Sequence, residues 1–226
     1  MNEAFFCSDL HLGHKTLMKG FRGTIFSSME EHDNTITENL LALPRGSRLY
    51  ILGDLFWKYN SEQMMQFFAK LRKKKIDLHL IEGNHDKTVN WKNVTIKSIS
   101  QMKSITINKQ PIFLCHYPME VYNRSHYNAW SLYGHVHYED ETWKKNYANQ
   151  HFQGKKLNVN LELHNFKPWS FDEIADHMST MTDNWDLIKR ESVIPHVHDF
   201  KHYSTSAGES YRCYCGVEAT CILPLR

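Results

Sequence analysis

Long apolar runs, a strong net charge and an even set of cysteines are all missing from this chain of 226 residues. No apolar stretch approaches the roughly 20 residues that a membrane-spanning helix needs, and the first four residues show no basic or apolar leader. Lysines and arginines number 27 against 25 aspartates and glutamates, so a net charge of +2 does not indicate a dedicated nucleic-acid binder. Five cysteines, an odd number, argue against a secreted disulfide framework. These absences favour a cytoplasmic protein that does not contact a membrane.

Histidine, by contrast, is abundant, with 15 residues, and five short blocks combine the side chains that metal sites use. Each block follows an apolar run typical of a strand, and the carboxyl ends of such strands are where ligands bind in a sheet buried between helices. Residues two apart in an extended segment point the same way, so Asp9 and His11 can reach one ion together. The blocks are Asp9-Leu10-His11, Gly53-Asp54, Gly83-Asn84-His85-Asp86, His116 and Gly134-His135-Val136-His137.

Five such blocks in series predict a site for two metal ions, a device for cleaving phosphate esters. Two neighbouring cations need a bridging carboxylate, and Asp54 is the best candidate because it is the only carboxylate of its block. Oxygen and imidazole ligands without thiolate favour Mn²⁺, with Fe, Zn²⁺, Ni²⁺ or Mg²⁺ as alternatives. A water between the ions would lose its proton near neutral pH and attack phosphorus as hydroxide.

The remaining side chains of the third block are expected to act on the substrate. His85 is not needed as a ligand, so we expect it to protonate the departing oxygen, with Asp86 orienting its ring or sharing its charge. The glycines that precede Asp54, Asn84 and His135 predict tight turns in which the backbone approaches an ion closely.

The order of the blocks resembles the calcineurin-like metallophosphoesterases, whose pattern is D-x-H, GD, GNH with D or E, H, and GHxH. The resemblance runs from about Phe5 to about Ile174 and is to the small bacterial and phage branch. It implies an α/β fold (four-layer α+β), in which a two-sheet β-sandwich is flanked by helices. It also implies one ion held by Asp9, His11, Asp54 and His137, a second held by Asp54, Asn84, His116 and His135, and His85 as general acid.

The sequence departs from two branches of the superfamily, which makes their substrates poor candidates for this chain. Protein phosphatases of the superfamily carry an arginine after the GD block and a GNHE motif, whereas here Leu55-Phe56-Trp57-Lys58 follows and the motif ends in Asp86. The lipid-A-pathway hydrolases typically have arginine where His85 stands. The segment 117–128 is rich in Tyr, Asn, Arg and His that could bind a base or a phosphate. We therefore predict a small phosphodiester or a nucleotide as substrate.

Two alternatives stay open at this point. One is a nuclease acting on DNA or RNA, since the superfamily cleaves many phosphate esters with the same centre and substrate choice lies in surrounding loops. The other is a non-catalytic binding protein on the same fold, although such relatives usually lose ligands that are all present here.

Several other residues could serve either function or packing. His14 could reach the substrate or cap the following helix. Arg22, His32, Asp33 and Arg124 could bind phosphate or support the ligands, but ordinary surface or packing roles are expected for them. Cys7 and Cys115 lie within apolar runs and are expected to be small core residues.

Local patterns predict three helices and a hairpin. One helix is expected over residues 28–43 and another over 170–178. A third begins at Ser61, and its buried side is predicted to be Met64, Met65, Phe67, Phe68 and Leu71. The hairpin joins 105–107 to 111–115.

The chain changes character near residue 192. We predict a phosphoesterase domain over residues 1–190 and a His/Cys-rich appendage over residues 191–226. The appendage could hold a structural Zn²⁺ through His196, His198, Cys213 and Cys215. The alternative is a polar tail with surface histidines.

Overall fold

A computed structural model describes residues 3–92, 94–137 and 154–188, together with the backbone of three strands between residues 200 and 219. The chain divides into two compact units, residues 1–187 and residues 188–226. Within the second unit, strands β10 (Phe200–Thr205), β11 (Gly208–Cys213) and β12 (Glu218–Ala219) pair antiparallel. His196, His198, Cys215 and the side chain of Cys213 lie outside the described part, so the zinc site stays a prediction.

The first sheet of the first unit has the strand order β4-β3-β2-β1-β9. Strands β1 to β4 run parallel, and β9 pairs antiparallel with β1. The carboxyl ends of β1, β2 and β3 therefore meet at one edge, and the first three ligand blocks follow these strands there. The bounds are β1 Ala4–Cys7, β2 Arg48–Leu52, β3 Asp77–Ile81, β4 Ser98–Ser100 and β9 Trp169–Ser170.

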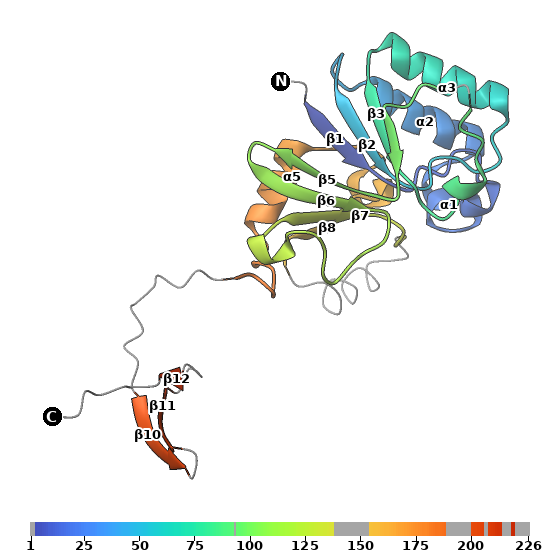
Figure 1. The fold of residues 1–226 in the computed structure, drawn as a ribbon. Coiled ribbons are helices and arrows are strands. Elements are labelled where there is room, and N and C mark those ends of the chain that lie inside the picture. The colour runs from blue at the N-terminus through green and yellow to red at the C-terminus, as the bar shows by residue number, and fades with distance from the viewer. Residues whose placement is uncertain are drawn as a thin grey trace. The chain divides into compact units, whose positions relative to one another are not determined.

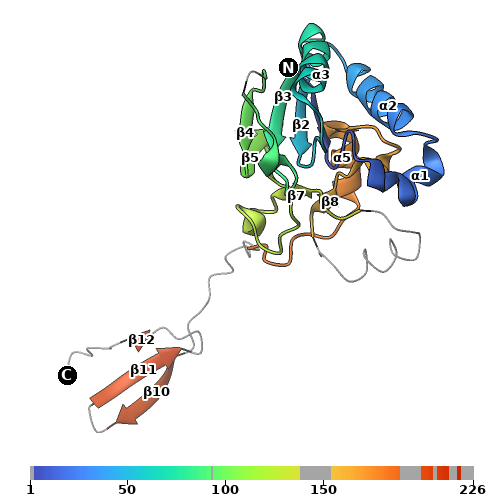
Figure 2. The ribbon, with the colours of Figure 1, turned by 90° about the vertical axis from the view of Figure 1, so that its right-hand side faces the viewer.

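Helices α2 (Met29–Leu41) and α3 (Ser61–Lys73) cover one face of this sheet (Figures 1 and 2). Ser28 caps α2, and Asn60 begins α3 with a capping box, so both predicted helices are present with polar caps at their starts. One detail of the prediction was wrong. Met65 is 50% exposed, because the buried stripe of α3 advances by three or four residues and Met65 lies outside it.

The second sheet has the order β5-β6-β7-β8. Its bounds are β5 Met102–Ile107, β6 Gln110–Cys115, β7 Trp130–Tyr133 and β8 Lys156–Asn158. The predicted hairpin joins β5 to β6 through Asn108 and Lys109, whose positive φ angles of 48° and 68° suit a tight two-residue turn. Strands β6, β7 and β8 are parallel, so His116 and residues 134–137 both follow strand ends at one edge.

The two sheets pack face to face around an apolar core. Phe6 and Leu52 of the first sheet share this core with Leu114 and Leu132 of the second. Helix α5 (Phe171–Ser179) adds Ile174 and Met178 to the same core, and Ser170 caps it as predicted. Two mixed sheets flanked by helices confirm the predicted fold class. Cys7 and Cys115 are buried free thiols, in line with small core residues.

Short helical segments complete the first unit: η1 Lys15–Lys19, α1 Phe21–Ile25, η2 Asp86–Thr88, η3 Ser125–Tyr127 and η4 Leu161–His164. Among the described residues, no helix combines the length and the apolar character that crossing a bilayer requires.

Candidate metal centre

Asp9, His11 and His137 form one group of potential ligands, with one donor atom from each within 4.8 Å of the others. Asp9 and His11 follow strand β1, and His137 follows β7 in the other sheet. The Nε2 atoms of His11 and His137 are 3.2 Å apart, and Asp9 Oδ1 lies 3.8 and 3.7 Å from them. The face-to-face sheets thus bring together two of the predicted blocks that are far apart in the sequence.

The hydrogen bonding of these rings fits a cation at this position. Nδ1 of His137 lies 3.0 Å from the Glu162 carboxylate and donates to it, which leaves Nε2 facing His11 and Asp9. Burial alone would lower the pKa of His137, but the Glu162 and Asp9 carboxylates raise it, as a cation at Nε2 would require. Burial holds the pKa of His11 well below its usual range, so this ring is neutral. Two nitrogens that bind one ion at about 2.1 Å lie about 3.0–3.4 Å apart, which the observed separation matches.

Asp54, His116 and His135 form a second group. The fully buried His116 donates from Nδ1 to the Leu52 carbonyl over 2.7 Å, so its Nε2 bears a lone pair. That nitrogen faces the side-chain oxygen of Asn84 at 3.1 Å. Two acceptors face each other here, and a cation between them would satisfy both.

The Asp54 carboxylate connects the two groups. Its Oδ2 lies 3.5 Å from His11 Nε2 and 3.6 Å from His116 Nε2, while Oδ1 accepts the backbone N–H of His85 at 3.0 Å. One oxygen therefore faces both ligand groups, which is the arrangement a bridging carboxylate needs. All seven side chains predicted as ligands come together at this edge, and their oxygen and nitrogen donors fit divalent ions.

The backbone of the ligand loops is strained. Four of the candidate ligands are non-glycine residues with left-handed φ angles between 50° and 70°: Asp9, His11, Asp54 and His135. Each such residue costs roughly 1–2 kcal/mol relative to an ordinary conformation. Strain of this kind persists where the surrounding fold holds side chains for a function.

Glycines before the ligands make room for neighbouring ligand side chains. Gly53 has a φ of 91°, which alone favours glycine. A Cβ at Gly53 would collide with His116 and one at Gly83 with Asp54, whereas a Cβ at Gly134 would collide with Ser8 and with Asp9. The sequence predicted close approach of the backbone to an ion. In the structure, side chains expected to hold that ion are among the atoms that require glycine at all three positions.

His85 stands at the mouth of the centre. Its ring forms a third group of potential ligands with His11 and Asp54. Its Nε2 is 3.8 Å from Asp54 Oδ2, and its side chain is 29% exposed, so it faces both the centre and solvent.

Asp86 contacts backbone rather than substrate space. It is fully buried, and its carboxylate accepts hydrogen bonds from the amides of Asp54, Leu55 and Gly83 at 2.7, 3.0 and 2.9 Å. Burial raises its pKa, while these three donors oppose that rise. These bonds connect the turn at residues 83–86 to the turn at residues 53–54. The sequence predicted that Asp86 orients the His85 ring or shares its charge, and the hydrogen bonds described here are to backbone amides instead.

Glu162, at the start of η4, is a contributor that the sequence did not single out. Its Oε1 accepts from Arg22 Nε at 2.7 Å and from His137 Nδ1 at 3.0 Å. Burial alone would raise the pKa of Glu162, but His137 and the Arg22 guanidinium hold it at about 2. A carboxylate behind a metal-binding histidine fixes its tautomer and raises its basicity. No local pattern marks Glu162, since both of its partners are distant in sequence.

Arg22 and His32 were expected to be ordinary surface or packing residues, yet both are buried beneath the ligand loop. Arg22 donates to the carbonyls of Asp9 and Leu10, and it also binds His32 Nε2 at 2.8 Å. The His32 ring is held in turn by Asp33 at 2.8 Å. This network secures the backbone of the first ligand block.

His14 does not cap the helical segment that follows it, because its side chain makes no capping hydrogen bond. Its ring stacks on Trp57 at 4.2 Å, and its centroid lies 5.3 Å from that of His11. Capping is therefore not the role of His14, and its ring lies beside the metal centre, where a substrate contact would be made.

The segment 117–128 is engaged mainly in packing. Tyr122, Ser125 and Asn128 hydrogen-bond to Asn184, Asp186 and Asp183. Arg124 is exposed. Tyr117 lies beside the centre, with its ring 4.9 Å from that of His135. Within this segment, Tyr117 is thus the residue that the structure places beside the centre.

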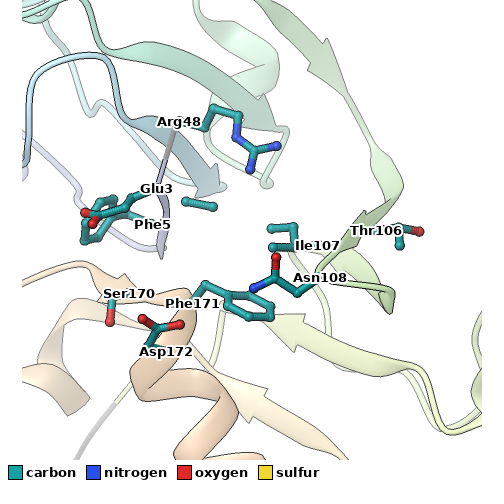
Figure 3. Close-up of a pocket in the computed structure, with 10 residues that line it drawn as sticks. Glu3, Phe5, Arg48, Thr106, Ile107, Asn108, Ser170, Phe171 and Asp172 are labelled. Carbon is teal, nitrogen blue, oxygen red and sulfur yellow. The ribbon is translucent and has the colours of Figure 1, made fainter. Parts of the chain in front are cut away.

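Two of the described cavities differ in their position relative to the metal centre. A cavity of about 570 Å³ lies at the amino ends of β1 and β2, opposite the ligand edge, with Arg48 across from Ser170 and Asp172 (Figure 3). None of the candidate ligands lines it. A second cavity, of about 480 Å³, includes His85 in its wall.

Comparison with known proteins agrees with this centre. The chain belongs to the calcineurin-like phosphoesterase family, whose model matches residues 4–211. It is 27% identical over 176 residues to an uncharacterized protein of Methanocaldococcus jannaschii, covering 77% of this chain and 90% of that protein.

A solved structure from Aquifex aeolicus shows a similar fold. A crystal structure of a protein of unknown function from Aquifex aeolicus has a TM-score of 0.61 at 26% identity, covering 78% of this chain and all of that one. The phosphoesterase Yfce of E. coli, at a TM-score of 0.36 and 16% identity over 70% of this chain and 78% of that one, is too distant to inform the site.

Proposed function

We propose that this chain is a metal-dependent phosphoric ester hydrolase with two metal ions at the centre described above. The observation that carries the proposal is the Asp54 Oδ2 atom, which faces His11 on one side and His116 on the other at 3.5 and 3.6 Å. A carboxylate shared by two ligand groups is what two adjacent cations require. Family membership supports the same reading.

The seven side chains would divide between two ions. When bound, two divalent ions supply an activated water and neutralise charge on the phosphate. The donor set favours Mn²⁺, with Fe, Zn²⁺, Ni²⁺ or Mg²⁺ as alternatives. Asp9, His11, Asp54 and His137 would hold one ion, and Asp54, Asn84, His116 and His135 the other.

His85 would protonate the leaving oxygen. It faces the centre without being needed as a ligand, and its partial exposure lets it recover a proton from solvent. Asp86 would act as a positioning residue, because its hydrogen bonds to three backbone amides fix the turn that carries His85 against the turn that carries Asp54.

A small phosphodiester or a nucleotide is the substrate class we favour. The cavity of about 480 Å³ beside His85 is of a size that suits a small ligand. A nuclease is the second candidate, although a net charge of +2 gives no electrostatic support for long nucleic acids. A non-catalytic role is disfavoured because every expected ligand is present.

A metal-restored activity panel tests the proposal. After chelation, activity on p-nitrophenyl phosphate, its bis-ester, single-stranded DNA and RNA should vanish, and Mn²⁺ should restore it at least as well as Mg²⁺. Asp54→Asn should lose far more activity than His14→Ala, because Asp54 faces both groups. Full activity in Asp54→Asn would contradict the proposed two-ion centre. Restored cleavage of DNA or RNA alone would favour the nuclease.

A further inference from the structure

The cavity beside His85 has a composition that suits a particular kind of leaving group. We call it the Trp57 pocket, and its described lining residues are Phe56, Trp57, Lys58, Tyr59, Asn60, Ser61, Met64, His85, Val89 and Asn90. Phe56 and Met64 are buried and form an apolar floor. Asparagine, serine and lysine side chains supply polar groups around it. None of these lining residues is acidic.

A neighbouring cavity provides a contrast. It shares Trp57, Lys58 and Tyr59 but also contains Glu30 and Asp33, and His85 does not line it. Of these two cavities, the Trp57 pocket is thus the one that adjoins the proposed proton donor and has no carboxylate among its described lining residues.

Trp57 is held firmly where it meets the pocket. Its backbone N–H donates to the Leu12 carbonyl at 2.8 Å, which ties the loop to the segment of the first ligand block. His14 stacks on the indole at 4.2 Å with an interplanar angle of 20°. His85 meets the indole edge to face at 4.4 Å. An aromatic side chain fixed in this way binds a planar group at little entropic cost.

The position of His85 decides what the pocket would receive. A proton donor must lie next to the leaving oxygen, so the group attached to that oxygen extends away from the metal ligands and past His85. The Trp57 pocket is the described cavity that has His85 in its wall.

We propose that the Trp57 pocket binds the leaving group of the substrate and that this group is a nucleoside. The inference rests on the proposed function. A nucleoside is uncharged, presents a planar base for stacking, and carries sugar hydroxyls for the polar rim. Stacking on an aromatic side chain tolerates any base, so the pocket would select nucleosides as a class rather than one base.

Adenosine is the direct probe, because it has no phosphate and binds without help from the metal centre. Calorimetric titration of the full chain in the presence of a chelator should show binding. Trp57→Leu should weaken it about tenfold, equivalent to about 1.4 kcal/mol. Trp57→Phe keeps an aromatic ring against His14 and should lose about threefold. Trp185→Leu is the matched control, since Trp185 is 58% exposed and lines neither the pocket nor the centre.

The outcomes separate this inference from the proposed function. Hydrolysis of nitrophenyl esters without Trp57-dependent adenosine binding would overturn the pocket assignment and leave the hydrolase standing. Trp57-dependent binding without hydrolysis of any ester would support the pocket and remove the hydrolase. Equal binding of p-nitrophenol and adenosine would overturn the nucleoside assignment. Unchanged thermal unfolding of Trp57→Phe shows that its loss of binding is not a loss of fold.

Discussion

Replacing Glu162 by glutamine tests whether the buried network tunes the metal centre. Glu162 accepts from both Arg22 and His137 through a single oxygen. Glutamine keeps the shape and one acceptor oxygen but removes the charge. His137 would then be a weaker base and its tautomer would be less firmly set, so we expect Glu162→Gln to bind Mn²⁺ about 10–100-fold more weakly.

The same change should lower the stability of the metal-free protein. Breaking a buried ion pair costs about 3–5 kcal/mol when a charge is left alone. Arg22 keeps its bonds to two carbonyls and to His32, so we expect a smaller loss, of about 2 kcal/mol. For a protein of this size, that loss corresponds to a fall in Tm of about 4–8 °C.

Two measurements check these expectations: calorimetric titration of the metal-free protein with Mn²⁺, and thermal unfolding in the presence of a chelator. Glu173→Gln is the control, because Glu173 completes the capping box of α5 and contacts no candidate ligand. It should cost up to about 1 kcal/mol and leave Mn²⁺ affinity unchanged. A lower Tm with unaltered Mn²⁺ affinity in Glu162→Gln would refute the reasoning, because Glu162 would then serve the fold alone.

Three further changes probe other parts of the chain. His85→Ala should retain its metal but hydrolyse esters more slowly. The loss of rate should be greater for alkyl esters than for nitrophenyl esters, because nitrophenolate hardly needs a proton to leave. Equal losses for both esters in steady-state kinetics would contradict a role for His85 as general acid. Gly134→Ala places a Cβ in collision with Ser8 Oγ and 2.6 Å from Asp9 Oδ2. Calorimetry should therefore show weaker Mn²⁺ binding, and thermal unfolding should show a loss of about 1–3 kcal/mol. Wild-type values in both would show that the loop adapts. Removal of residues 191–226 should leave a folded phosphoesterase, and elemental analysis should show one Zn²⁺ fewer per chain if the tail binds zinc; equal metal content would mean that it does not.

Much of the fold could be predicted because its signals are local. Helices α2, α3 and α5 are capped by Ser28, Asn60 and Ser170, and such caps are determined by residues within one turn. The hairpin between β5 and β6 likewise depends on a few adjacent residues. Met65 was misplaced because a run of apolar residues conceals which of them lie on the buried stripe of a helix.

The part played by Asp86 could not be seen in the sequence. Because Asp86 is next to His85 in the sequence, we predicted that it acts on the His85 ring. In the structure its carboxylate accepts from the amides of Leu55 and Asp54, about thirty residues away. Segment 117–128 offers a second example. Its polar residues suggested a ligand, and the structure engages Tyr122 and Asn128 with residues 183–184 instead.

The candidate ligands and their places after strands can be identified from the amino-acid sequence, because ligand chemistry and strand periodicity are properties of consecutive residues. The residues that support these ligands from behind become visible only in the folded chain. Arg22 and Glu162 are 140 positions apart, and they meet with His137 because the two sheets pack face to face. Contacts of this kind depend on the packing of whole elements, and no local pattern records them.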